Sequence, residues 1–276
     1  MKENVKRCVK NKTVIISLSV ILVIAVVSFL APVLVPGADS AQDLSARLSP
    51  PGAGHILGTD ELGRNVLARL LYGTRMSFLI AILPTALAVI VGTVFGIIGA
   101  FFGKAADSAV TWASDVTLAI PGILLAMVIL YSFGGSAVSV FLSIVIIEWG
   151  GIARIVRSAT QRIAKSEYVK AAKTAGVGRF RIMTRHIFPN LVPTLIVLFT
   201  LNIPASVLSE SSLSFLGIGI QPPGVSLGLM VNQSKQYLFD MPWLSLAPAG
   251  MILILVLAFS FLGDVLRDIL DPTMKQ

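Results

Sequence analysis

Two glutamates lie inside long apolar stretches of the sequence, where a carboxyl group needs polar surroundings. Glu148 stands beside Trp149, and Glu210 lies in a stretch rich in serine. An ionisable side chain at the centre of a bilayer costs about 3 kcal/mol on insertion scales. Each glutamate therefore either faces a polar path that a cation can follow, or makes a structural contact, with Arg154 or with a partner chain.

Two more polar residues accompany Glu210 in its stretch. Asn202 and Ser206 lie on either side of Pro204, a pattern that predicts a kinked helix with one polar face. We interpret Asn202 and Ser206, like both glutamates, as candidates for lining such a path.

The sequence lacks the residue sets that covalent or metal catalysis needs. It holds one cysteine, so no intrachain disulfide can form, and only two histidines, His55 and His186, so a Cys/His metal cage is excluded. Two isolated glutamates do not supply paired acids or a Ser/His set. We therefore expect no catalytic residues, no bound metal and no cofactor.

The composition points to a membrane protein. Of the 276 residues, 55% are hydrophobic and 13% charged, and the mean hydropathy is +0.86. Soluble domains are about 25% charged, so a soluble enzyme, a disordered chain and a nucleic-acid binder all fit poorly. The net charge of +8 fits instead the Lys- and Arg-rich cytoplasmic loops of membrane proteins.

The apolar stretches predict an all-α membrane protein with six transmembrane helices. A basic tail at 1–13 precedes the first helix at 14–35, whose apolar run exceeds the about 7–15 residues of a signal-peptide core, so we expect an uncleaved anchor. A Gly- and Pro-rich segment at 36–75 leads to a five-helix core at 76–264 and a tail at 265–276. The core spans are expected at about 76–102, 116–133, 137–155, 191–216 and 244–262.

Small residues and proline predict details of two of these spans. Gly92, Gly96 and Gly99 recur every three or four residues, the spacing of a helix that packs closely against another. Pro121 is expected either to kink the third span or to begin it.

The distribution of basic residues predicts the orientation. With the N-terminus inside the cell, the inside segments hold 17 of the 22 Lys and Arg residues. This bias predicts that both termini and the segment at 157–188 are cytoplasmic, in a multi-pass protein of a prokaryotic inner (plasma) membrane.

The basic segment at 157–188 is too polar to span and too periodic for a disordered loop. Ser166 and Glu167 are typical of a helix start, alanines follow, and Gly176 and Gly178 end the helix. A second helical piece is expected from about Arg179 to Phe188, and Pro189 is expected either to end it or to open the next span. Such a rigid knob suits coupling to a soluble partner; the alternative is a connector that lies on anionic lipid head groups.

At this segment the sequence resembles the EAA coupling loop of binding-protein-dependent ABC importer permeases. A Phe precedes the proline where the family often has Leu. The matching residues are Glu167, Ala171, Ala172, Gly176, Ile182, His186, Ile187, Pro189 and Asn190.

Further motifs resemble the peptide/nickel branch of that family, in particular its shorter, C-type permease. Together they cover about residues 50–276. Asn65 stands where the branch has Asp, and Leu227 where Trp is common. The motif before the second span matches at His55, Gly58, Asp60, Gly63 and Arg64, and two others match at 213–223 and 262–272.

The resemblance implies a type I ABC importer fold and a division of labour between subunits. A second, homologous permease would complete the path, two ATPases would dock on the loop through Glu167, Ala171, Ala172, Gly176 and Pro189, and an external solute-binding protein would deliver the substrate. The sequence contains no Gly-x-x-x-x-Gly-Lys-Ser/Thr phosphate loop, which is consistent with ATP hydrolysis in a partner. Peptides, nickel and metal chelates remain open as substrates, and Glu210 or Glu148 would meet a peptide amine or a chelated metal.

Two alternatives remain open, one for the segment around Asp60 and one for the function of the chain. Asp60 and Arg64 can pair if their stretch is helical, and this segment is either a lid against the binding protein or partner, or a plain surface helix. An ion-gradient-driven secondary transporter or channel is the alternative function, although no internal repeat is evident.

Overall fold

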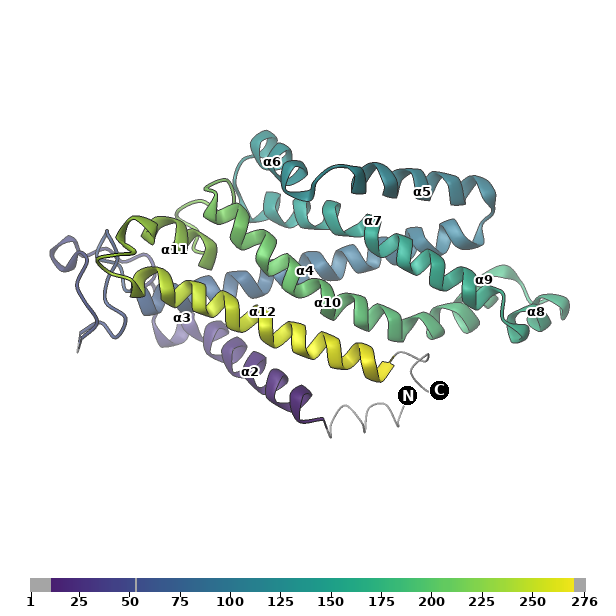
Figure 1. Cartoon of the computed structure of the whole chain (residues 1–276), viewed down its shortest axis with the longest axis horizontal. Coiled ribbons are helices and arrows are strands. Elements are labelled where there is room, and N and C mark those ends of the chain that lie inside the picture. The colour runs from purple at the N-terminus through teal and green to yellow at the C-terminus, as the bar shows by residue number, and fades with distance from the viewer. Residues whose placement is uncertain (1–10, 53, 271–276) are drawn as a thin grey trace.

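The structure, a computed structural model, describes residues 11–52 and 54–270. The part described is almost entirely helical, with long helices lying side by side (Figure 1). The longer helices are α2 (Lys12–Phe29), α4 (Val66–Phe101), α5 (Lys104–Ala119), α6 (Gly122–Phe133), α7 (Ala137–Ala164), α10 (Phe188–Phe215) and α12 (Trp243–Leu270). The short ones are α3 (Ala31–Leu34), η1 (Leu44–Ala46), α8 (Glu167–Thr174), α9 (Arg179–Ile182), a π-helical turn (Met183–Ile187), α11 (Leu227–Ser234) and η3 (Lys235–Tyr237).

Within the described residues, five helices are long and apolar enough to cross a membrane, and a sixth span exists if α5 and α6 count as one. The all-α expectation is confirmed, and six spans are reached with that pair included. The pair bends by 87° at Ile120 and Pro121. Pro121 disfavours helical backbone at the residue before it, and Ile120 is indeed extended, with ψ at 125°. The expected third span is thus a broken one.

Helix α4 begins ten residues earlier than the second span expected at 76–102. The Asn65 side chain accepts a hydrogen bond from the Ala68 backbone N–H (3.1 Å) and so caps the first turn. Arg69 and Arg75 consequently lie on a helix rather than in a loop. The Asn that departs from the branch motif therefore has a local structural role.

Glycines allow α4 and α7 to cross closely. A Cβ at Gly92 would lie 2.7 Å from Ile152 Cγ2, and one at Gly96 would lie 2.7 Å from the Ala153 carbonyl oxygen. Gly99 faces Val110 of α5 in the same way (3.2 Å). The close packing expected from the glycine spacing is confirmed.

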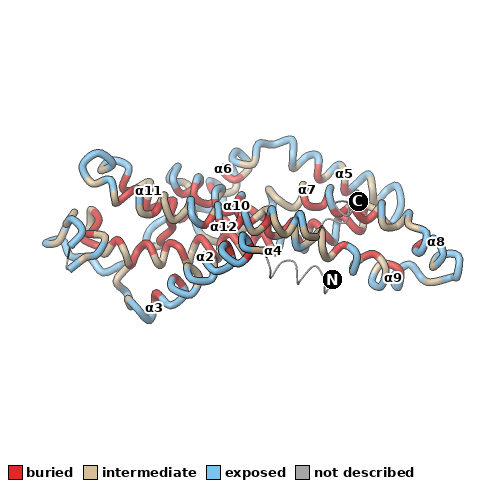
Figure 2. Tube along the Cα trace, turned by 60° about the horizontal axis from the view of Figure 1, so that its bottom comes forward, coloured by how far each residue is buried: buried red, intermediate tan, exposed pale blue. Residues whose placement is uncertain are grey.

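Buried residues run through the middle of α4, α7 and α10, while much of α2, α5 and α8 is exposed (Figure 2). One core cluster includes Phe78, Leu255 and Phe259, which join α4 to α12. The exposed side of α2 is apolar: Leu22 is 61% exposed and Val23 60%. Such a surface suits contact with lipid.

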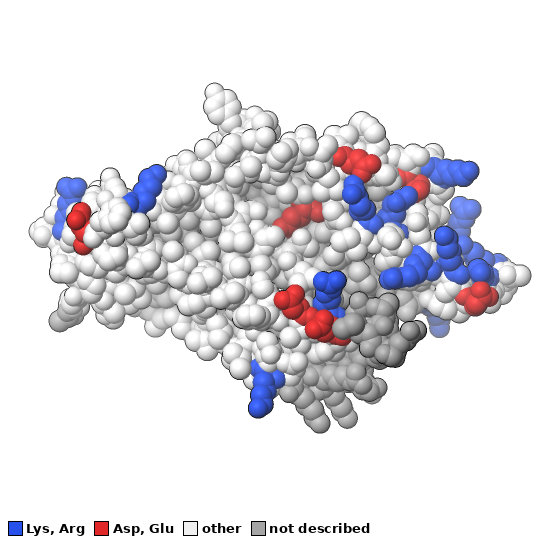
Figure 3. Space-filling view, in the orientation of Figure 1, with Lys and Arg blue, Asp and Glu red and all other residues white. Residues whose placement is uncertain are grey.

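The two ends of the bundle differ in charge. α2 begins and α12 ends toward the end that carries α8 and α9 (Figure 1). Basic side chains gather at that end, and the middle of the face is largely uncharged (Figure 3). The segment before α4 and helix α11 form the opposite end (Figure 1).

Candidate functional site

Helix α8 forms where the coupling loop was expected, with Ser166 as its N-cap. Glu167 lies in the first turn, where its charge is favoured by the helix dipole, and it pairs with Lys170 at 2.9 Å. Its side chain is 91% exposed. Ala171 is also exposed, and Ala172 is half-buried. Most of α8 is thus free on the surface of this chain.

A glycine reverses the chain after α8. Gly176 has a φ of +79°, a conformation that other residues rarely adopt, whereas Gly178 has an ordinary φ of −60°. Val169 is fully buried and packs in one cluster with Ile182 and Ile187. This small core fixes α8 and α9 against the rest of the bundle.

Pro189 opens the next span and does not end the second helical piece. It lies at the start of α10, which follows α9 and the π-helical turn without a break. Asn190 Nδ2 donates to the His186 carbonyl oxygen at 2.6 Å and to the Tyr168 hydroxyl at 3.3 Å. The loop is therefore joined directly to α10.

Glu148 takes part in a polar cluster that connects three helices. The Ser206 hydroxyl on α10 donates to Glu148 Oε1 on α7 at 2.5 Å and lies 2.6 Å from the Thr85 hydroxyl on α4. Glu148 Oε2 has no hydrogen-bond partner in the described chain. The structural pair of Glu148 with Arg154, one of the alternatives expected from the sequence, does not form. Arg154 pairs instead with Asp115, with 2.5 Å between Nη2 and Oδ1.

Glu210 lies in a different environment, fully buried within this chain. Its carboxyl group accepts hydrogen bonds from Ser214 (2.8 Å) and Ser211 (3.4 Å). The hydroxyls of Ser77 on α4 and Ser226, just before α11, lie beside it. The carboxyl group thus lies where α10 meets α4 and the segment before α11, hydrogen-bonded to two serines of its own helix.

Asn202 is half-buried and makes a local contact. Its Nδ2 donates to the Leu198 carbonyl oxygen one turn earlier, at 2.7 Å. The structure therefore brings Asn202, Ser206 and Glu148 to neighbouring positions, since Ser206 also lies 3.2 Å from the Asn202 carbonyl oxygen. Glu210 belongs to a separate cluster.

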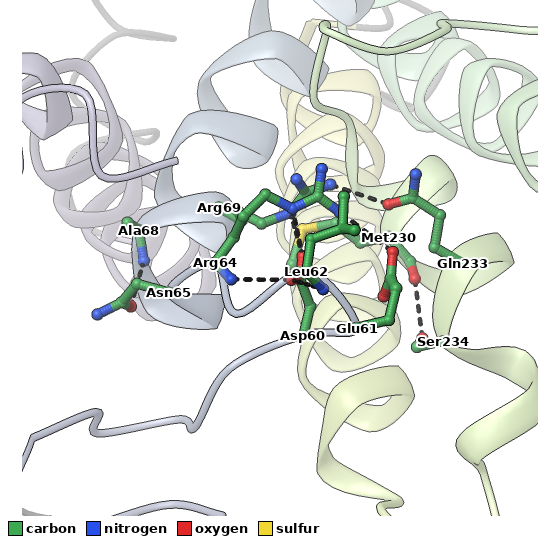
Figure 4. A network of polar contacts seen from close by, with 10 residues as sticks. All are labelled: Asp60, Glu61, Leu62, Arg64, Asn65, Ala68, Arg69, Met230, Gln233 and Ser234. Carbon is green, nitrogen blue, oxygen red and sulfur yellow. Dashed lines mark hydrogen bonds and ion pairs between the residues drawn. The ribbon is translucent and has the colours of Figure 1, made fainter. Parts of the chain in front are cut away.

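The motif before α4 forms a buried ionic network (Figure 4). Arg64 Nε lies 2.7 Å from Asp60 Oδ2, so the expected pair forms, although in a turn and not in a helix. Arg69 Nε lies 3.4 Å from the same oxygen, and Arg69 Nη2 donates to Gln233 Oε1 of α11 at 2.9 Å. Sequence reasoning missed Arg69 and Gln233; the basic residue inside an apolar helix was the available signal.

The glycines of this motif permit the tight path of the chain. Gly58 and Gly63 have φ values of +71° and +69°. A Cβ on Gly58 would collide with the Ser49 carbonyl oxygen, and a Cβ on Gly63 with the Asp43 carbonyl oxygen. His55 pairs through its backbone with Gly52. The motif residues therefore build one compact turn against α4 and α11.

The broken six-span bundle, its intramembrane polar clusters and the exposed α8–α9 loop define the class of multi-pass membrane permeases. The chain belongs to the family of binding-protein-dependent transport system inner membrane components, whose model matches residues 92–276. Residues 1–51 match the N-terminal transmembrane domain of oligopeptide transport permease C. These matches confirm the resemblance.

Similar proteins align along nearly the whole chain. The dipeptide transport system permease protein DppC of Haemophilus influenzae is 36% identical over 97% of this chain and 92% of its own length. DppC of Alkalihalophilus pseudofirmus is 35% identical, covering 99% and 90%. The oligopeptide transport system permease protein OppC of Mycobacterium bovis is 34% identical, covering 98% and 94%.

Proposed function

We propose that this chain is a non-catalytic permease subunit of an ATP-driven importer of peptides. The names of its relatives, which are dipeptide and oligopeptide permeases, favour peptides over nickel or metal chelates. In this proposal a second, homologous permease completes the path, two ATPase subunits supply the energy, and an external solute-binding protein delivers the peptide.

The observation that carries the proposal is the exposed loop formed by α8 and α9. Glu167 and Ala171 project from a helix that a small buried core and the Asn190 contacts join to α10. A partner that pushes on α8 would therefore move α10, which carries Ser206. This rigid link is what coupling of ATP hydrolysis to transport requires.

The path is proposed to run along the face that holds Glu148, Ser206 and Asn202. Glu148 is half-buried, and its Oε2 is an enclosed oxygen without a hydrogen-bond partner in the described chain; in this proposal the side chain turns toward the path and its carboxylate binds the ammonium group of a peptide. Glu210 is enclosed by its own chain, and we assign it a structural role at the place where α10 packs against α4 and α11.

The network of Asp60, Arg64 and Arg69 is proposed to hold in place the external segment against which the binding protein or the partner permease docks. It attaches the segment with His55, Gly58 and Gly63 to the start of α4 and to α11. In this orientation α8, α9 and both termini lie in the cytoplasm, in agreement with the basic residues at that end.

The test is peptide uptake by proteoliposomes that contain the purified complex. We expect uptake to require ATP at the α8 face and the peptide-loaded binding protein at the other, and to be insensitive to ionophores. Uptake that persists without ATP and collapses with an ionophore would instead support the gradient-driven alternative.

A further inference from the structure

A large aromatic side chain is exposed beside the coupling helix. Phe180, in the first turn of α9, is 74% exposed and stands between Arg179 and Arg181, which are exposed as well. The residues that follow Phe180 anchor this turn in the protein core, because Ile182 and Ile187 are only 1% and 0% exposed. Phe180 is therefore presented on a rigid support.

The length of the helix places Phe180 outside the lipid. α9, the π-helical turn and α10 together run from Arg179 to Phe215, 37 residues, or about 55 Å at 1.5 Å per residue. The hydrocarbon core of a bilayer is about 30 Å thick, and each head-group layer adds about 5–8 Å. Phe180 precedes Leu191, the first residue of the expected span, by eleven residues, or about 16 Å. It thus projects beyond the head groups.

The charges around Phe180 define what it can bind. Between residues 165 and 190 the chain has six Lys and Arg residues and one acid, Glu167, which pairs with Lys170. All six basic side chains are exposed: Lys165, Lys170, Lys173, Arg179, Arg181 and Arg185. A complementary surface would have an apolar pocket surrounded by carboxylates.

We propose that Phe180 inserts into an apolar, acid-rimmed pocket of an ATPase subunit, as a second contact beside α8. This inference rests on the proposed function and makes it more specific. An aromatic side chain loses little conformational entropy when it is buried, and flanking arginines are typical of the residues that dominate binding energy at interfaces. The loop would then contact the ATPase subunit at two points, and the second contact would prevent the subunit from rotating about α8.

The direct test places a photo-crosslinking amino acid at position 180 of the chain in the assembled complex. We expect ATP-binding subunits, identified by mass spectrometry of the crosslinked product, to be captured from position 180. The control is position 239, because Phe239 is 96% exposed and belongs to the segment between α11 and α12, at the end of the bundle opposite α8 (Figure 1). Crosslinks from position 180 to lipid, or to no subunit, would overturn the proposal.

Substitutions supply a second measurement. Phe180→Ala should weaken retention of the ATPase subunits by about 10- to 30-fold, the effect of losing one dominant interface residue, whereas Phe180→Leu and Phe239→Ala should retain them. Membrane insertion should be unchanged, because an exposed side chain contributes little to the fold. Full retention by Phe180→Ala would contradict the proposal.

The two hypotheses fail in different ways. If Phe180→Ala behaves like the wild type while Glu167→Lys with Gly176→Pro abolishes uptake, the Phe180 anchor is wrong and the coupling function stands. If the wild-type complex shows no ATP-dependent peptide uptake, the proposed function itself is wrong.

Discussion

The two intramembrane glutamates illustrate how far residue type alone can be interpreted. Both were expected to need polar surroundings, and both have them: Glu148 next to Ser206 and Thr85, Glu210 among serines. The sequence could not distinguish the two environments. Glu210 is enclosed because α11, formed by residues 227–234, packs over it, and no local pattern predicts that contact.

Exchange of each glutamate for glutamine distinguishes a residue that lines the translocation path from one with a structural role. Glu148→Gln should reduce uptake of peptides with a free amino group by about 10-fold or more, because a charge-assisted contact of about 1.5–3 kcal/mol is lost, and should affect N-acetylated peptides little. The measurement is uptake of matched free and N-acetylated peptides in proteoliposomes.

Glu210→Gln is the matched control for this comparison. It should lower uptake of both peptide classes equally, if at all, because Glu210 contacts only its own chain. Preference for free amines that survives Glu148→Gln, or that disappears in Glu210→Gln, would contradict the assignment.

For the helices, the sequence predicted where each one lies along the chain better than the angles at which they are bent or packed. Pro121 marked a break, but no local pattern predicts the 87° bend between α5 and α6, both of which contact α7. The start of α4 at Val66 was missed because Arg69 and Arg75 interrupt the apolar pattern. Arg69 is accommodated by Asp60 and by Gln233, which lies 164 residues away in the chain, a distance that no sequence periodicity covers.

The crossing of α4 and α7 yields a prediction about stability. Gly96→Val should destabilise the subunit by about 1–3 kcal/mol or prevent its assembly, the usual cost of overpacking, because its Cβ would lie 2.7 Å from the Ala153 carbonyl oxygen. Thermal unfolding of the detergent-solubilised complex measures this.

A second glycine serves as the control for that crossing. A Cβ at Gly151, which lies in α7 whereas Gly96 lies in α4, would meet nothing within 4 Å. Gly151→Ala should therefore leave the unfolding temperature at or slightly above that of the wild type. Equal destabilisation by both substitutions would show that α4 and α7 do not cross as described.

For the whole molecule, the charge asymmetry predicts topology. The chain has a single cysteine, Cys8, so a Cys8→Ser background allows single-cysteine labelling. Thr174→Cys in α8 should react with a membrane-impermeant thiol reagent only after cells are permeabilised, whereas Ser45→Cys, before α4, should react in intact cells. The reverse pattern would place α8 outside and exclude its contact with ATPases.

Above all, we propose that α8 and its glycine turn transmit ATP hydrolysis to the path. The most direct measurement is peptide uptake and ATP hydrolysis in the same proteoliposomes, for the wild type, Gly178→Ala and the double variant Glu167→Lys with Gly176→Pro. Proline cannot adopt the φ of +79° found at Gly176, whereas alanine accepts the φ of −60° at Gly178. We expect the double variant to insert normally but lose ATP-driven uptake, and Gly178→Ala to retain it; wild-type uptake by the double variant would contradict the claim.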